Sequence, residues 1–110
     1  MELDISKIVT ELGIGKEVVV ELLNEYLKES EVLLTKLGVA IASGDYAVMI
    51  STAHTLKGSA GNLRMTPIQD TARGIEMAAK EKKDKATMEP QVVALKALHE
   101  ELRTILGNVS

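Results

Sequence analysis

Apolar residues recur at helical spacing through almost the whole chain, and this period constrains the fold more than any other feature of the sequence. A short first helix is predicted to end at Gly13. The longer helices are expected over about residues 16–42, 45–64, 66–80 and 87–107. No repeat, low-complexity segment or strand-like run interrupts them. Amphipathic helices with short connections predict an all-α fold, an antiparallel up-down four-helix bundle with the additional short N-terminal helix laid across one end.

Residues with known positional preferences mark the expected helix ends. The candidate N-caps are Asp4 or Ser6, Asp45, Thr66 and Thr87. Pro67 suits the first helical position after Thr66, and Gln69 would complete a capping box there. Pro90 would then fall in the first turn of the last helix, and Gly107 would end that helix.

Composition narrows the class of protein. The 110 residues suffice for one domain, expected over 1–110, with a core of Leu, Ile, Val, Ala and Met, because the chain has two tyrosines and no Phe or Trp. The absence of cysteine excludes disulfides and thiolate chemistry. A net charge of −3 argues against a nucleic-acid partner, which favours a basic surface. No apolar run is long enough to span a membrane and the N-terminus lacks a secretory pattern, so we expect a cytoplasmic protein.

One histidine lies away from the core side of its predicted helix. At ~100° per residue, the apolar residues of the central helix fall within roughly 80° of arc, and His54 points about 140° from the centre of that stripe. The stripe consists of Met49, Ala53, Leu56, Ala60 and Leu63. The surface neighbours of His54 are small or apolar: Ala47, Ile50, Gly58 and Gly61. The sequence therefore presents an imidazole on a nearly bare patch of helix surface.

The residues around His54 favour a chemical role over a purely structural one. A glycine inside a helix costs ~1 kcal/mol relative to alanine, and this helix carries two on the His54 side. Lys57 lies one turn on, within side-chain reach of the imidazole, and is well placed for an anion attached to the ring. An exposed, neutral histidine beside a cation suits a nucleophile toward a phosphoryl group.

The segment resembles the histidine-containing phosphotransfer (HPt) domain family of two-component phosphorelays, whose hallmark is His-x-x-Lys-Gly followed by small residues. The match covers His54, Lys57, Gly58, Ser59 and Ala60. The family usually has glycine where this chain has Arg64, a departure that concerns the turn after the helix. Gly61 in place of the commoner alanine is similar to the phosphotransfer domain of chemotaxis kinases.

The resemblance implies a phosphocarrier. His54 would accept a phosphoryl group from a receiver-domain aspartate or a histidine kinase and pass it on, with Lys57 compensating its charge. The resemblance also implies that Glu76, 22 residues after His54, hydrogen-bonds Nδ1 and orients the ring; an alternative is a surface acid paired with Lys80. No cofactor is expected, because Mg²⁺ would come with the partner receiver.

A receiver would dock on the small and apolar surface around His54, with Ile50, Gly58 and Gly61 central. The first helix and its turn are a further candidate contact, through Ile8, Leu12 and Ile14. A monomer is expected.

Other candidates for chemistry carry less weight. His99 flanks the core stripe of the last helix and is interpreted as structural, while Arg64 and Arg73 are interpreted as solvated. The sequence has no metal-ligand spacing, no nucleophile elbow and no Gly-rich phosphate loop. We therefore expect that the chain is not an enzyme and does not bind ATP. Two alternatives stay open: a non-catalytic helical interaction module, such as a degenerate HPt domain, and a small metal-binding bundle.

Overall fold

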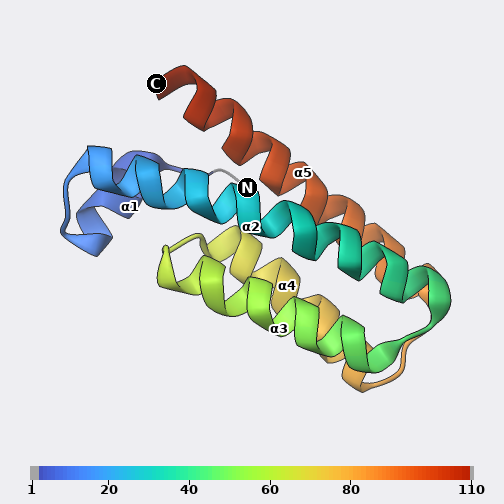
Figure 1. Ribbon diagram of the computed structural model, residues 1–110. Coiled ribbons are helices and arrows are strands. Elements are labelled where there is room, and N and C mark those ends of the chain that lie inside the picture. The colour runs from blue at the N-terminus through green and yellow to red at the C-terminus, as the bar shows by residue number, and fades with distance from the viewer. Residues whose placement is uncertain (1–2, 110) are drawn as a thin grey trace.

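The computed structural model describes residues 3–109, and five helices follow one another along them (Figure 1). They are α1 (Ile5–Leu12), α2 (Lys16–Ser43), α3 (Tyr46–Asn62), α4 (Thr66–Lys80) and α5 (Lys85–Val109). Residues 1, 2 and 110, the ends of the expected 1–110 domain, lie outside the described residues.

The four longer helices form an antiparallel bundle. Each contacts two neighbours, in the cyclic order α2, α3, α4, α5 and back to α2. The α2–α3 and α4–α5 connections lie at one end of the bundle, and the α3–α4 connection lies at the other (Figure 1). Helix α1 packs against α2 near that second end. The predicted all-α fold, an up-down four-helix bundle with a short additional helix, is confirmed.

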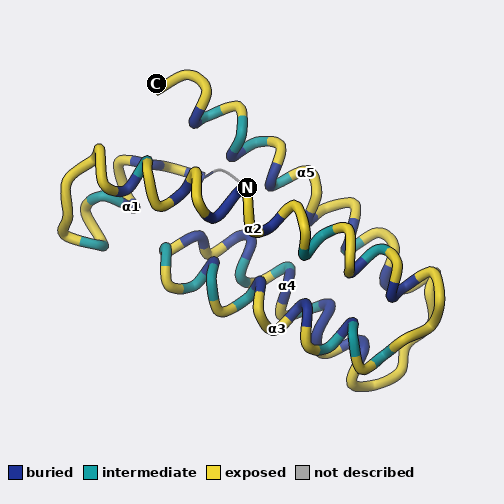
Figure 2. The backbone as a smooth tube through the Cα atoms, in the orientation of Figure 1, coloured by how far each residue is buried: buried dark blue, intermediate teal, exposed yellow. Residues whose placement is uncertain are grey.

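The interior is aliphatic, as the scarcity of aromatic residues requires. Buried residues line the facing sides of the helices along the length of the bundle (Figure 2). On α3 the predicted stripe is buried at Met49, Ala53, Leu56 and Ala60 and partly buried at Leu63. Because these side chains face the core, the opposite side of α3 faces solvent, as in any amphipathic helix at the surface of a bundle.

Several helix ends differ from the prediction. Thr66 is the first residue of α4 and not its cap; Met65 occupies the cap position, and no side chain caps this end. The expected capping box with Gln69 is therefore not formed. The reason lies in the preceding turn, where the Met65 amide donates to the carbonyl of Ala60 and so belongs to the end of α3.

Helix α5 is longer than predicted at both ends. It begins at Lys85, and Asp84 accepts hydrogen bonds from the backbone N and Oγ1 of Thr87 at 2.9 and 2.7 Å. Thr87 is thus a donor to the cap and not the cap itself. Pro90 consequently lies inside the helix, beyond its first turn, and the helix continues through Gly107 to Val109. Within residues 3–109, no helix is long and apolar enough to cross a membrane.

Candidate functional site

His54 stands on the solvent side of α3 with one ring nitrogen engaged. Its side chain is 65% exposed, on the face of α3 opposite the buried stripe. The Nδ1 atom lies 3.0 Å from Oε2 of Glu76 on α4. No hydrogen-bond partner of Nε2 occurs among residues 3–109. Nδ1 of the imidazole is therefore hydrogen-bonded to the neighbouring helix, while Nε2 faces solvent.

Glu76 is a buried carboxylate with three polar partners. Its side chain is 5% exposed, so the surface-acid alternative is wrong about its exposure, although the pair with Lys80 does exist. Oε1 accepts from Lys57 Nζ at 2.6 Å, while Oε2 faces His54 Nδ1 and also lies 3.4 Å from Lys80 Nζ. Burial acts to raise the pKa of Glu76, but the hydrogen bonds from Lys57, His54 and Lys80 outweigh it and hold that pKa at about 2. The carboxylate is therefore ionised and acts as an acceptor.

The ionised carboxylate determines which nitrogen of His54 carries the proton. A carboxylate can only accept, so Nδ1 must be the N–H that donates to it, and Nε2 of the neutral ring keeps its lone pair. That lone pair points to the exposed side of the ring. Chemically, this arrangement is a nucleophile whose tautomer is fixed by a partner on the neighbouring helix.

Lys57 is less free than the sequence suggested. Its side chain is only 25% exposed, and its ammonium is bound to Glu76 at 2.6 Å. The sequence placed Lys57 within reach of the ring, but it gave no sign that a carboxylate from α4 would hold the ammonium group. Its proposed role toward a phosphoryl group therefore has to include this ion pair.

The comparisons with known proteins agree with this geometry. The sequence profile of the Hpt domain matches residues 21–106, which is most of the chain. The chain belongs to the Hpt domain family. It is similar in structure to the HPT domain of an Hpt sensor hybrid histidine kinase from Shewanella, with a TM-score of 0.79 and 22% sequence identity, covering 98% of this chain and 96% of that one. At that identity the likeness establishes the fold. A comparison with curated protein sequences gives no match.

Membership of the family sets the broad function. The Hpt domain is a phosphotransfer module of two-component signalling, and Hpt domains are phosphocarriers that interact with receiver domains and histidine kinases. The resemblance drawn from His54, Lys57 and Gly58 is confirmed at this level. The roles of individual residues are not settled by family membership and stay predictions.

The two glycines near His54 in this Hpt domain differ in their surroundings. A Cβ added at Gly58 would meet no atom within 4 Å, so this position is open to an approaching partner. A Cβ added at Gly61 would lie 2.5 Å from Nε2 of Gln69 on α4. Gly61 therefore leaves room for the Gln69 side chain between α3 and α4, a contact that the docking interpretation did not include. Ile50 is partly buried.

The first helix contributes less surface than expected. Ile8 is buried at 3% exposure and belongs to the core, so it is not available for docking. Leu12 is partly buried, and Ile14 is exposed. Of the two candidate arginines, Arg73 pairs with Asp70 at 3.2 Å, and Arg64 donates to the carbonyl of Gly61 at 3.2 Å. Both side chains thus have partners other than the imidazole.

The second histidine is a core residue, as interpreted. His99 is 2% exposed; its Nδ1 donates to the carbonyl of Leu95 at 2.7 Å, and its Nε2 accepts from the Tyr26 hydroxyl at 2.7 Å. Burial lowers the pKa of His99 and raises that of Tyr26. The one sign of this pair in the sequence is that Tyr26 is a single tyrosine in an otherwise aliphatic helix stripe. Tyr26 and His99 are 73 positions apart, so no local sequence pattern could have connected them.

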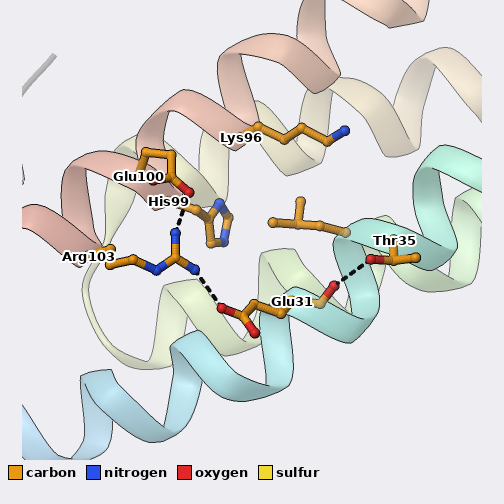
Figure 3. Close-up of a pocket in the computed structure, with 7 residues that line it drawn as sticks. Glu31, Thr35, Lys96, His99, Glu100 and Arg103 are labelled. Atoms are coloured by element: carbon orange, nitrogen blue, oxygen red, sulfur yellow. Dashed lines mark hydrogen bonds and ion pairs between the residues drawn. The ribbon is translucent and has the colours of Figure 1, made fainter.

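A surface pocket lies over His99 between α2 and α5 (Figure 3). Arg103 bridges Glu31 and Glu100 across it, beside the ring. Arg103, Glu31 and Glu100 thus pair with one another, and both nitrogens of His99 are already bonded. No group of three or more His, Asp or Glu side chains in residues 3–109 is arranged to hold a metal ion.

Proposed function

We propose that this Hpt domain carries a phosphoryl group on Nε2 of His54, accepting it from a phosphorylated receiver domain or a histidine kinase and yielding it to a receiver aspartate. The observation that carries the proposal is the pairing of an exposed imidazole with a buried, ionised carboxylate at Nδ1. A surface histidine without a function has no need of such a partner. The proposed unit spans residues 1–110 and acts as a monomer in the cytoplasm.

The transfer follows from the tautomer. The Nε2 lone pair attacks phosphorus in line with the bond to the leaving oxygen, that bond breaks, and the electron pair stays with the receiver's carboxylate. The ring gains positive charge as the N–P bond forms, because Nδ1 keeps its proton. Glu76, 3.0 Å from Nδ1, stabilises that charge.

The negative charge of the phosphoryl group needs compensation from both proteins. Lys57 supplies it from this side, since the residue lies one helical turn from His54 and its ammonium is held beside the site by Glu76. Mg²⁺ and the remaining groups are expected on the partner receiver, and the domain needs no cofactor or ATP site of its own. The chain is then a relay without turnover.

The partner meets the open side of α3. Gly58 leaves space beside the ring, and Ile50 offers a partly exposed apolar contact one turn before it. A receiver surface can thus bring its phosphorylated aspartate against Nε2 without displacing a side chain at position 58.

Incubation with phosphoramidate, a small phosphodonor, tests the proposal directly. The wild-type chain is expected to take one phosphoryl group that is stable to alkali and labile to acid, and to lose it to a receiver domain supplied with Mg²⁺. His54→Gln should take none. The sequence has two histidines, and His99 is buried, so label on His54→Gln would contradict the assignment. A wild-type chain that stays unlabelled with phosphoramidate and with phosphorylated receivers would favour an interaction module.

A further inference from the structure

Two lysines, not one, share the Glu76 carboxylate. Lys57 Nζ binds Oε1 at 2.6 Å, and Lys80 Nζ lies 3.4 Å from Oε2, the oxygen that also faces His54 Nδ1. Lys57 comes from α3 with His54, whereas Lys80 comes from the last turn of α4. The proposed transfer uses Lys57 and Glu76 but assigns nothing to Lys80.

Phosphorylation of His54 changes the charge balance of this cluster. With a neutral ring, one carboxylate and two ammonium groups leave one positive charge in excess. A phosphoryl group brings a charge of about −1.5 to −2 within reach of Lys57. If Lys57 turns toward that group, it weakens its bond to Glu76, and a carboxylate that is 5% exposed cannot easily be left without a cation.

Lys80 is placed to remain on Glu76 when Lys57 turns. It follows Glu76 by four residues on the same helix, the order that favours a Glu–Lys pair. Its ammonium also lies at the C-terminal end of α4, where a positive charge is stabilised by the helix dipole. Lys80 shares Oε2 with His54 Nδ1, but its place beside Glu76 is set by α4 alone, so phosphorylation of His54 leaves Lys80 within reach of the carboxylate.

We infer that Lys80 is a positioning residue of the phosphotransfer site: it holds the Glu76 carboxylate against Nδ1 of His54 while Lys57 moves to the phosphoryl group on Nε2. The inference rests on the proposed function. It divides the work between the two lysines, one compensating the phosphoryl group and one keeping its supporting carboxylate in place. A purely structural Lys80 would instead contribute only a surface ion pair, since its side chain is 59% exposed.

The test compares Lys80→Met, Lys80→Arg and a control, Lys96→Met, each labelled with phosphoramidate and then freed of donor. Lys96 lines the α2–α5 pocket, so its replacement makes the same change in net charge on another face. The N–P bond breaks fastest while Nδ1 is protonated, and a displaced carboxylate no longer stabilises that proton. We therefore expect the half-life of the phosphohistidine to lengthen by about three- to fivefold in Lys80→Met, the size of effect that loss of a partly exposed ion pair can produce. Lys80→Arg and Lys96→Met should keep the wild-type half-life.

Nitrogen NMR of the His54 ring separates positioning from stability. The Nδ1–H···carboxylate hydrogen bond should be present in unphosphorylated Lys80→Met, where Lys57 still holds Glu76, and weakened after phosphorylation. In wild type and in Lys80→Arg it should persist in both states. An unchanged half-life in Lys80→Met, or an equal change in Lys96→Met, would overturn the inference and leave the proposed function standing. Failure of the wild type to accept phosphate would instead count against the proposed function.

Discussion

Gly58 and Gly61 share a helix face with His54, yet the structure gives them different tasks. Alanine at position 58 meets open space, so it should raise the free energy of unfolding by about 0.5–1 kcal/mol through helix propensity alone. The added methyl group stands beside the imidazole, so transfer from a phosphorylated receiver should slow while labelling by phosphoramidate continues. Urea denaturation and transfer kinetics on Gly58→Ala measure the two effects.

Gly61→Ala is the matched control for that prediction. Its methyl group would press on the Gln69 side chain, which has to move, so its gain in stability should be smaller than that of Gly58→Ala. Its effect on receiver transfer should also be smaller, because the strain lies between α3 and α4. Equal effects of the two substitutions on both measurements would show that the distinction drawn from the packing is wrong.

At the scale of the element, three helices end in the same hydrogen-bonded turn. In each, a residue beyond the helix is left-handed, and the amide that follows it bonds the carbonyl five positions back: Asp45 to Ala40, Met65 to Ala60 and Lys83 to Ala78. Helix α2 places glycine in that position, at Gly44 with φ of 74°. Helices α3 and α4 place Arg64 and Lys82 there, with φ of 60° and 53°.

Glycine should therefore stabilise the ends of α3 and α4. The left-handed conformation costs a side-chain-bearing residue roughly 1–2 kcal/mol, part of which is returned when glycine gains freedom in the unfolded chain. Arg64→Gly and Lys82→Gly should each raise the free energy of unfolding by about 0.5 kcal/mol. Urea denaturation tests this, with Arg64→Ala and Lys82→Ala, which keep the strain, as controls. If the glycine variants were no more stable than the alanine variants, the left-handed turn would not carry this cost.

For the whole molecule, periodicity was sufficient to predict the fold and the direction of His54. Both depend on the angle of a residue around its own helix, as the buried Leu56 and the exposed His54 illustrate. What was missed depends on a second helix. Glu76 lies on the flank of its own helix; its contact with His54 was predicted from the resemblance, but its burial was not. Gln69 was expected to complete a capping box with Thr66, but its side chain lies against Gly61, a contact that no local pattern encodes.

The Tyr26–His99 pair should limit the stability of the whole bundle on both sides of neutral pH. His99 has its pKa lowered by burial from the ordinary 6.5, so the unfolded chain takes up the proton first and stability is lost as pH falls below 6.5. The pKa of Glu76 is depressed from 4.5 to about 2, so the bundle loses further stability as pH falls from 4.5 toward 2. Tyr26 has its pKa raised from the ordinary 10.0, so its contribution is present below pH 10 and is lost as pH rises above it.

Tyr26→Phe isolates the contribution of this pair. The substitution leaves Nε2 of His99 without its donor, which should cost about 1–3 kcal/mol near neutral pH. The variant should also lose less stability than wild type as pH rises above 10, because its unfolded chain has no phenol to ionise at this position. Free energies of unfolding from urea denaturation between pH 7 and 11, compared with wild type, measure both effects. If the variant lost stability above pH 10 as steeply as wild type, the buried hydroxyl would not be the group that couples folding of the bundle to alkaline pH.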